Sequence, residues 1–380
     1  MEYLVSVVRD EAGLLLLEDA WTRLVARSHV TIFASFAWVL AWWHAFGAGK
    51  RLYVLVATDP AGEVRGIAPL MLGRSGPLRR LEFIGTGLSD AGDFLLDRDH
   101  ALPVAQAIFA HLRRRRREWD LLDLDEVPPY SPLASWLEKD KPTGLHIMHL
   151  PRTDAPYVAL PDTWEAYTAT LHRKTRQHLE GFARRVIQET GAYFRLVTED
   201  SDVPEAVARF YDLHRARWST KSGALNPEHM SPTFLPFLQE VCRRSATAGY
   251  LRLSELCVGE AVISSWISFQ VNERLSGYMT GFDPAWSKER PGKLLHGFVV
   301  RQALSEHARE LDFGRGAEEY KFEMGAISRR NVRFILGNNT PRSLLAFGLM
   351  SLRVRARDLV RRYQSARAAR ASISTDQAHV

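Results

Sequence analysis

The stretch that most constrains the fold lies between residues 274 and 321. Alternating apolar residues predict a strand over residues 275–282, and a turn-rich loop follows over residues 283–290. Pro291 then opens a segment whose apolar residues recur at helical spacing, and residues 310–313 predict a second short strand. Strand, loop, helix and strand in this order predict a crossover unit that joins two parallel strands of one sheet.

The front of the predicted helix has the chemistry of an anion site. Pro291 suits the first helical turn, Gly292 leaves the backbone open to a close ligand, and Lys293 adds a positive charge. Free N–H groups and the helix dipole attract anions there, and a pyrophosphate group is the natural occupant. The alternative interpretation is an ordinary helix N-terminus, because proline is common at the first position of helices in general.

Four motifs in this part of the chain carry a family resemblance: Tyr278–Asp283, Pro291–Leu295, Asp312–Gly316 and Tyr320–Lys321. They resemble the GNAT-superfamily group of BioF2-like and cellulose-biosynthesis-associated acetyltransferases, which is similar in turn to the Fem-type aminoacyltransferases. The resemblance is clearest over residues 163–321. It implies an α/β (α+β) fold of two tandem GNAT-like lobes, each a mixed sheet flanked by helices. The chain departs from the family at Ser287 to Gly292, where many GNAT enzymes carry an Arg/Gln-x-x-Gly-x-Gly/Ala loop.

The resemblance also implies the reaction, which is transfer of an acyl group from acetyl-CoA or another acyl-CoA. The donor would bind at four consecutive residues: Pro291, Gly292, Lys293 and Leu294. Tyr320 is then the candidate general acid, and Lys321 is a partner for phosphate or for the oxyanion. No Ser-His-Asp or Cys-His arrangement appears in the sequence, which favours direct transfer in a ternary complex over a covalent intermediate.

Three carboxylates remain open as the catalytic base: Asp283, Glu319 and Asp312. Asp283 ends the predicted strand, where it can act on a substrate or simply begin the Asp-Pro turn. Asp312 lies in the short second strand, which favours an inward, structural position. No metal site is expected, because His296 and His307 are too far apart along the helix to share one ion.

Basic and aromatic residues upstream supply candidate substrate contacts. Lys174 lies in a basic segment that the family shows at the same place, although a solvated helical face would look the same. Arg217 and Trp218 end a predicted helix and resemble a family motif in which the two residue types are adjacent. Arg217 can hold a carboxylate or phosphate with two hydrogen bonds. Arg315, within the Asp312–Gly316 motif, is the fourth candidate.

Length and composition are those of a two-domain globular protein, with 380 residues of which 46% are hydrophobic and 25% are charged. We expect an N-terminal GNAT-like lobe without a donor site (residues 1–150), a GNAT acyltransferase domain (151–340) and a basic helical tail (341–380). The aromatic cluster at residues 33–46 could stack a sugar, but packing of the first lobe is the favoured interpretation.

Two cysteines make no disulfide framework and fit a reducing compartment. The sequence also shows no export signal and no apolar run long enough to span a membrane. We therefore expect a cytoplasmic protein.

The net charge of +6 belongs to the tail. Residues 341–380 hold eight arginines against two aspartates, and the preceding 340 residues are close to neutral. A neutral body argues against nucleic-acid binding. The tail has an amphipathic pattern over residues 344–363, typical of a helix that docks on anionic lipid or protein, or that packs on the body. Packing on the body is the favoured interpretation.

Three functions remain in competition. The first is an acyl-CoA-dependent N-acyltransferase that acts on an amine of a small molecule, an amino sugar or a polysaccharide precursor. The second is a Fem-type transferase that takes an aminoacyl group from charged tRNA, against which the neutral body argues mildly. The third is a non-catalytic GNAT-like binding protein within a biosynthetic assembly. The sequence does not reveal the acceptor or the oligomeric state.

Overall fold

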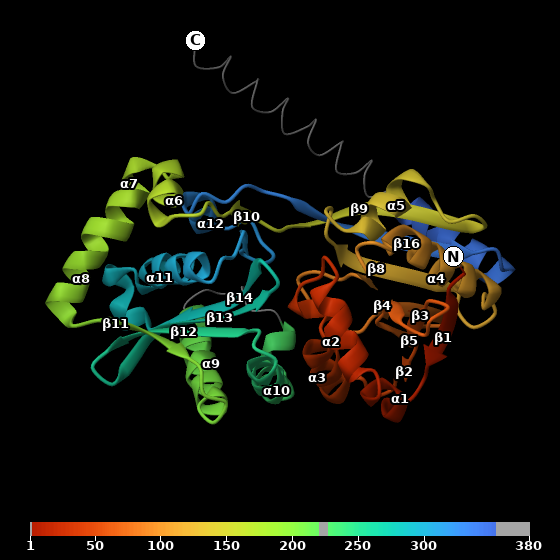
Figure 1. Cartoon of the computed structure of the whole chain (residues 1–380), viewed down its shortest axis with the longest axis horizontal. Helices are drawn as coiled ribbons and strands as arrows, with labels where there is room; N and C mark the ends of the chain where they lie inside the picture. The colour runs from red at the N-terminus through yellow and green to blue at the C-terminus, as the bar shows by residue number, and fades with distance from the viewer. Residues whose placement is uncertain (1, 220–226, 355–380) are drawn as a thin grey trace, which may run out of the picture.

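The computed structural model describes residues 2–219 and 227–354, which form two α/β lobes side by side (Figure 1). Figure 1 places the N-terminal lobe on the right, in red to yellow with β16 in blue, and the C-terminal lobe on the left, in green to blue. Mixed sheets flanked by helices in both lobes confirm the predicted fold class.

Two sheets build the N-terminal lobe. A four-stranded sheet has the order β1-β3-β4-β7, and a six-stranded sheet has the order β2-β5-β6-β8-β16-β9. The strands are β1 (Leu4–Val8), β2 (Arg51–Leu52), β3 (Val54–Thr58), β4 (Val64–Ala68), β5 (Leu70–Ser75), β6 (Leu78–Phe83), β7 (Leu95–Leu96), β8 (Leu121–Val127), β9 (Leu145–Asp154) and β16 (Arg330–Asn338). The helices are α1 (Glu11–Leu15), α2 (Glu18–Ala26), α3 (Phe36–Phe46), α4 (Ala101–Arg114) and α5 (Pro132–Lys139).

One six-stranded sheet, in the order β10-β15-β14-β13-β12-β11, forms the centre of the C-terminal lobe. Its strands are β10 (Tyr157–Ala159), β11 (Tyr193–Val197), β12 (Leu251–Val258), β13 (Ala261–Val271), β14 (Arg274–Phe282) and β15 (Glu310–Asp312). The helices are α6 (Trp164–Thr170), α7 (Arg173–Gln177), the π-helical η2 (His178–Phe182), α8 (Ala183–Thr190), α9 (Val203–Ser219), α10 (Phe234–Thr247), the short η4 (Pro284–Glu289), α11 (Pro291–Ser305) and α12 (Glu319–Glu323).

The predicted crossover unit is confirmed. Strand β14 leads through η4 into α11, and the chain returns as β15, which pairs parallel to β14. The two strands pair over Arg274–Ser276 and Glu310–Asp312, where β15 ends, and β14 continues to Phe282 paired with β13 on its other side. The last residues of β14 therefore lead to α11 without β15 beside them.

Strand β16 differs from the expected organisation, in which residues 151–340 form the second domain. It lies between β8 and β9 in a sheet of the N-terminal lobe, and it pairs antiparallel with both. Alternating apolar residues identify a strand at this position, but they do not show which sheet it joins. The proposed boundary at residue 150 is therefore crossed by the returning chain.

A shared hydrophobic core joins the two lobes. The indole of Trp38 in α3 is fully buried and makes edge contacts with Phe237 of α10, at 5.4 Å, and with Tyr278 of β14, at 5.1 Å. Trp42 is also buried. Packing, rather than sugar stacking, is thus the role of these two aromatic residues of the 33–46 cluster.

Candidate active site

A pocket of about 230 Å³ opens between the end of β14 and the beginning of α11. Its walls come from α9, the end of β14, η4, the first turns of α11 and the start of α12. The lining residues are Arg217, Thr280, Gly281, Phe282, Ser287, Arg290, Pro291, Gly292, Lys293, His296 and Tyr320. Five of the twelve residues predicted for the site are among them: Arg217, Pro291, Gly292, Lys293 and Tyr320.

The N-terminus of α11 forms one wall of the pocket. Pro291 occupies the first helical turn, and the N–H groups of Lys293 and Leu294 bond to the carbonyl of Arg290. A Cβ atom added at Gly292 would meet no atom within 4 Å, so the backbone there faces open space. The Lys293 ammonium pairs with the carboxylate of Glu323 in α12. This arrangement gives a ligand direct access to the positive end of the helix dipole, with a cation beside it.

Buried aromatic rings form the inner end of the pocket. The His296 imidazole is only 4% exposed; it lies 4.5 Å from the Trp266 ring and stacks on the Tyr320 ring at 5.2 Å, measured between centroids. Its Nδ1 has no hydrogen-bond partner among the described residues. Burial, with the nearby charges of Arg217, Lys321 and Lys293, lowers the pKa of His296 to about 3, so the ring is neutral near pH 7.

Tyr320 presents its ring to the same pocket from α12. Burial raises the pKa of its phenol to about 12, and the charge of Glu318 adds to the effect while that of Arg217 opposes it. The phenol therefore keeps its proton at neutral pH and can donate it.

Arg217 enters the pocket from the last turn of α9. Its Nη1 donates to Thr280 Oγ1 at 2.5 Å, and the guanidinium lies 5.1 Å from the centre of the Phe282 ring. Beside it, His214 Nδ1 donates to the carbonyl of Thr280 at 3.0 Å. These contacts fix the end of β14 against α9 and hold a cation at the pocket wall.

Lys321 lies behind the pocket rather than in its lining. It is 2% exposed, and its Nζ donates to three carbonyl oxygens of the loop after β15, those of Gly314, Arg315 and Gly316, at 2.8–3.3 Å. It also pairs with Glu318 at 2.9 Å. The ammonium thus holds the shape of that loop, and its predicted role toward phosphate or oxyanion stays a prediction.

None of the three carboxylates weighed as a base lines the pocket. Asp283 caps η4 by accepting from the amide of Ala285, and Glu319 is exposed on α12. Asp312 is buried and accepts from Arg329, as its inward position in a strand predicts. In the part of the chain that the structure describes, the pocket walls therefore hold no carboxylate.

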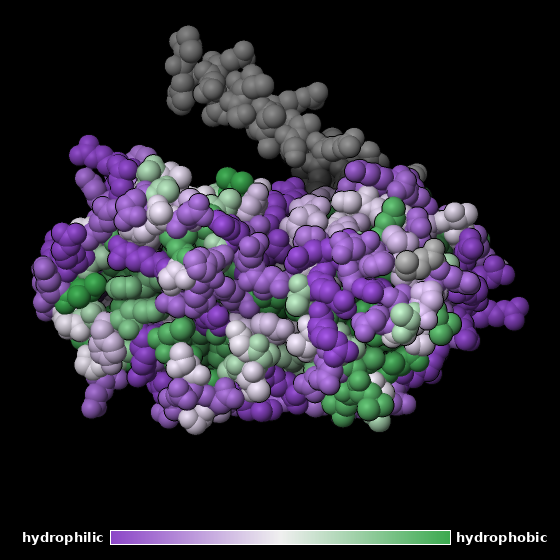
Figure 2. Space-filling model, in the orientation of Figure 1, coloured by the Kyte–Doolittle hydropathy of each residue, from purple (hydrophilic) through white to green (hydrophobic). Residues whose placement is uncertain are grey.

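The remaining predicted site residues lie elsewhere. Lys174 is exposed on α7, and Leu294 faces a second pocket, of about 360 Å³, between α8 and α11. Figure 2 shows apolar surface in the hollow between these two helices. Trp218 belongs to α9, but its side chain lies outside the described residues.

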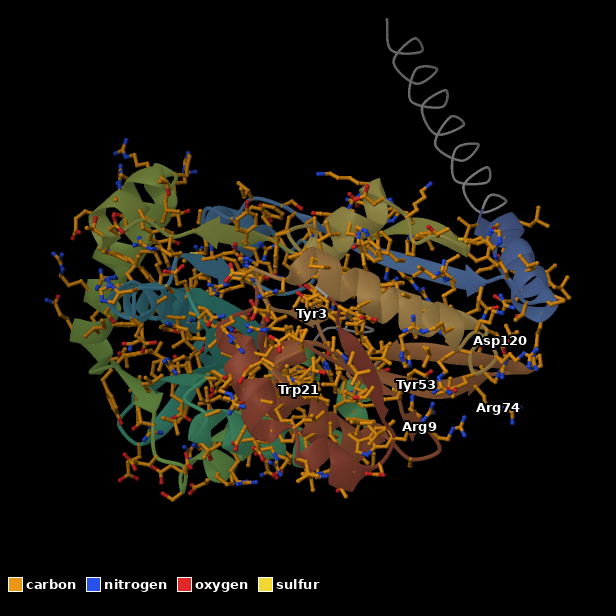
Figure 3. The ribbon with its side chains drawn as sticks, turned by 45° about the vertical axis from the view of Figure 1, so that its right-hand side comes forward. Tyr3, Arg9, Trp21, Tyr53, Arg74 and Asp120 are labelled. Carbon is orange, nitrogen blue, oxygen red and sulfur yellow. The ribbon has the colours of Figure 1, made fainter. Side chains whose placement is uncertain are left out.

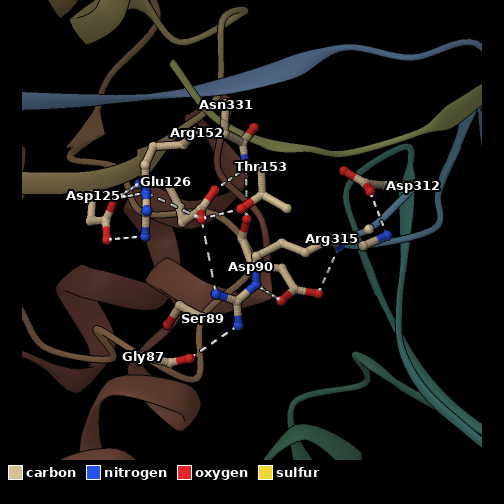
Figure 4. Close-up of polar contacts among 12 residues, drawn as sticks. Gly87, Ser89, Asp90, Asp125, Glu126, Arg152, Thr153, Asp312, Arg315 and Asn331 are labelled. Atoms are coloured by element: carbon tan, nitrogen blue, oxygen red, sulfur yellow. Dashed lines mark hydrogen bonds and ion pairs between the residues drawn. The ribbon is translucent and has the colours of Figure 1, made fainter. Parts of the chain in front are cut away.

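Arg315, predicted to bind substrate, connects the two lobes instead. Its Nε donates to Asp90 Oδ1 at 2.6 Å, and its Nη2 donates to the carbonyl of Gly87 at 3.0 Å (Figure 4). Gly314, beside it, has a positive φ of 70°, and a Cβ there would lie 2.5 Å from Asp90 Oδ2. The Gly-Arg-Gly sequence thus allows the two lobes to approach each other closely.

Six pocket residues were not predicted as site residues from the sequence: Thr280, Gly281, Phe282, Ser287, Arg290 and His296. His296 lies one helical turn after Gly292 and therefore on the same face of α11, which is the signal that could have identified it. Thr280 and Ser287 lie within the strand and the loop that lead to α11. Their closeness along the sequence to the predicted anion site is the signal that could have identified them.

Neither a metal centre nor a membrane span is found among residues 2–219 and 227–354. These residues hold no group of three or more His, Cys, Asp or Glu side chains placed to bind a metal ion. Within the same ranges, no helix combines the length and apolarity needed to cross a bilayer.

Comparisons with known proteins agree with this geometry. Residues 173–322 match the family model described as an acetyltransferase (GNAT) domain. A search of curated proteins gives no significant match.

Several solved structures share the two-lobed fold. A crystal structure of FemX has a TM-score of 0.64 at 10% identity, over 88% of this chain and 97% of that one. The C-terminal domain (DUF2156) of a putative lysylphosphatidylglycerol synthetase from Agrobacterium fabrum has a TM-score of 0.52 at 12% identity, over 88% and 95%. The structure of L-PGS from Bacillus licheniformis has a TM-score of 0.51 at 11% identity, over 89% and 96%.

Membership of the BioF2-like and cellulose-associated subgroup stays a prediction, since the matching family model is described only as an acetyltransferase (GNAT) domain. The matched range starts in α7 and ends in α12, so it contains the crossover unit and the pocket. Residues 173–322 are therefore similar to a GNAT acetyltransferase domain, within a fold similar to that of FemX, and these findings support a transferase of the GNAT type.

Proposed function

We propose that this protein is an acyl-CoA-dependent N-acyltransferase. The observation that carries the proposal is the pocket between the end of β14 and the N-terminus of α11. An open backbone at Gly292, the helix dipole and Lys293 suit the diphosphate of coenzyme A, and the pocket wall formed by the end of β14 suits its thioester arm.

The reaction is direct transfer to an amine, and the acceptor class we propose is a small molecule, an amino sugar or a polysaccharide precursor. The amine forms a C–N bond with the acyl carbon while the C–S bond breaks. Tyr320 gives its proton to the leaving thiolate and regains one from the attacking nitrogen as the amide forms, which balances the step without a carboxylate in the pocket. Positioning of the two substrates supplies most of the rate.

The reaction takes place in the cytoplasm in this proposal. Support comes from the two cysteines, Cys242 and Cys257, which are free and buried, as in a reducing compartment. FemX shares the fold at 10% identity. A Fem-type transfer from aminoacyl-tRNA is therefore the alternative function, and an experiment that measures donor binding distinguishes it from the function proposed here.

The test changes only the charge at the open helix end. Gly292→Asp places a carboxylate where the diphosphate would lie, and the space around the position accepts the side chain without disturbing the fold. We expect coenzyme A binding, measured by calorimetry, to weaken by roughly a hundredfold, because the new charge repels the phosphates and opposes the dipole.

Gly292→Ala is the matched control, because its Cβ also meets open space. It should bind coenzyme A within about fivefold of the unchanged protein, with the same thermal unfolding curve. A protein that does not bind coenzyme A at all, or a Gly292→Asp variant that binds it normally, would overturn the proposal. Binding of an aminoacyl-tRNA in place of coenzyme A would favour the Fem-type alternative.

A further inference from the structure

The helix formed by residues 341–354 is attached to the N-terminal lobe through one face only. Ser343 Oγ donates to the carbonyl of Asp120 at 2.5 Å, and a Cβ at Gly337 of β16 would lie 3.1 Å from the Phe347 ring. Figure 3 shows Asp120, which is labelled, at the end of the lobe beside this helix. Ser343 and Phe347 are four residues apart, so they share the attached face.

The opposite face of the same helix carries leucines that point to solvent. Leu345, Leu349 and Leu352 are 67%, 53% and 63% exposed. With about 3.6 residues per turn, these three positions fall within an arc of roughly 60° on the side away from Ser343. Exposed leucines in one stripe, on a helix already anchored by its other face, mark a surface that binds something apolar.

The charge next to this stripe is positive. Arg342 and Arg353 lie at its border by the same helical spacing, and the sequence from residue 341 to residue 380 has eight arginines against two aspartates. Arg342 lies 3.7 Å from Asp120, so its charge is partly offset, and by sequence residues 341–380 carry a net charge of +6. A partner with apolar groups beneath a negatively charged layer complements both the leucine stripe and the positive charge beside it.

We propose that the helix of residues 341–354 docks this protein on an anionic phospholipid surface, with the leucine stripe among the acyl chains and Arg342 and Arg353 at the phosphates. A second copy of the chain fits less well, because two such segments would bring equal positive charges together. The body of the protein is not the occupant, since it already contacts the other face of the helix. This surface lies outside the candidate active site, so the inference does not depend on the proposed reaction.

The test is flotation of the full-length protein with two kinds of vesicle: phosphatidylcholine alone, and phosphatidylcholine with a quarter of phosphatidylglycerol. We expect binding to the second kind only, and weakening of that binding by salt, because the attraction is partly electrostatic. A triple variant, Leu345→Gln, Leu349→Gln and Leu352→Gln, should bind about tenfold or more weakly, since it loses the apolar anchor but keeps every arginine.

The matched control replaces exposed leucines at another site, Leu15→Gln in α1 and Leu16→Gln beside it, which are 45% and 86% exposed. It should float like the unchanged protein. The proposal is overturned if the protein ignores phosphatidylglycerol vesicles, or if the triple variant binds them as well as the control does. A dimer in light scattering that the triple variant loses would assign the stripe to a second copy instead.

Discussion

Tyr320 is the predicted site residue whose surroundings bear most directly on catalysis. It stacks on His296, it lines the pocket, and its phenol stays protonated because burial raises its pKa to about 12. Its ring packs in the cluster regardless of the hydroxyl, so the hydroxyl can be removed with little loss of packing.

We predict that Tyr320→Phe binds coenzyme A as the unchanged protein does but transfers acyl groups roughly a hundredfold more slowly, the usual contribution of one general acid. The measurement is the release of free thiol from acetyl-CoA in the presence of a panel of amines. Equal rates for the two proteins would contradict the assignment of Tyr320 as the acid. Tight coenzyme A binding without thiol release in either protein would favour a non-catalytic binding protein.

For single residues, the sequence predicted the position of a side chain well wherever the local backbone fixes that position. Pro291, Gly292 and Lys293 are consecutive in one helical turn, so their common location in the pocket follows from the helix itself. His296 was missed as a pocket residue because helical periodicity marks every inward position of α11 alike. The Lys321 contacts were also hidden, since the three carbonyls that it binds come from a loop whose path the sequence does not display.

Among the elements, α12 and the loop before it depend on one ammonium group. We predict that Lys321→Met lowers the free energy of unfolding by about 2–4 kcal/mol, because three buried carbonyls lose a charged donor while the packed stem remains. Lys293→Met is the control: its ion pair with Glu323 is partly exposed, so its loss should cost less than about 1 kcal/mol.

Urea unfolding followed by circular dichroism measures both variants. If Lys321→Met proves as stable as the unchanged protein, the loop does not need the ammonium. The role predicted from the family resemblance, toward phosphate or oxyanion, would then be the better explanation of its burial.

The sequence predicts the order and direction of the helices and strands around the site. It does not always predict which sheet a strand joins. Strand, loop, helix and strand over residues 274–313 specify a parallel pair because a crossover connection of this length leaves few alternatives. Strand β16 has an equally clear apolar pattern, yet its partners β8 and β9 lie nearly 200 residues earlier along the chain. Pairing over such distances depends on packing of the whole molecule, which no local pattern contains.

For the whole molecule, the contact between Arg315 and Asp90 is the polar link between the lobes that Figure 4 displays. Both side chains are mostly buried, with 26% and 12% exposed. We predict a coupling free energy of about 2–3 kcal/mol in a double-mutant cycle of Asp90→Ala and Arg315→Ala, measured from unfolding curves, because each residue left alone would keep an unpaired buried charge.

The ion pair of Arg309 with Asp162 provides the comparison, since its side chains are 57% and 81% exposed. The same cycle there should give less than about 1 kcal/mol. A value for Asp90 and Arg315 as small as that of the exposed pair would show that this ion pair adds little to the association of the lobes, which would then depend more on the apolar core around Trp38.

The return of β16 to the first lobe affects how the protein can be made. While the ribosome is still adding residues 155–329, β8 and β9 have no strand between them, and their unpaired edges stay available to other chains. The first-made half of the molecule therefore completes its sheet only after β16 has emerged, so this half cannot be cut free as an intact module.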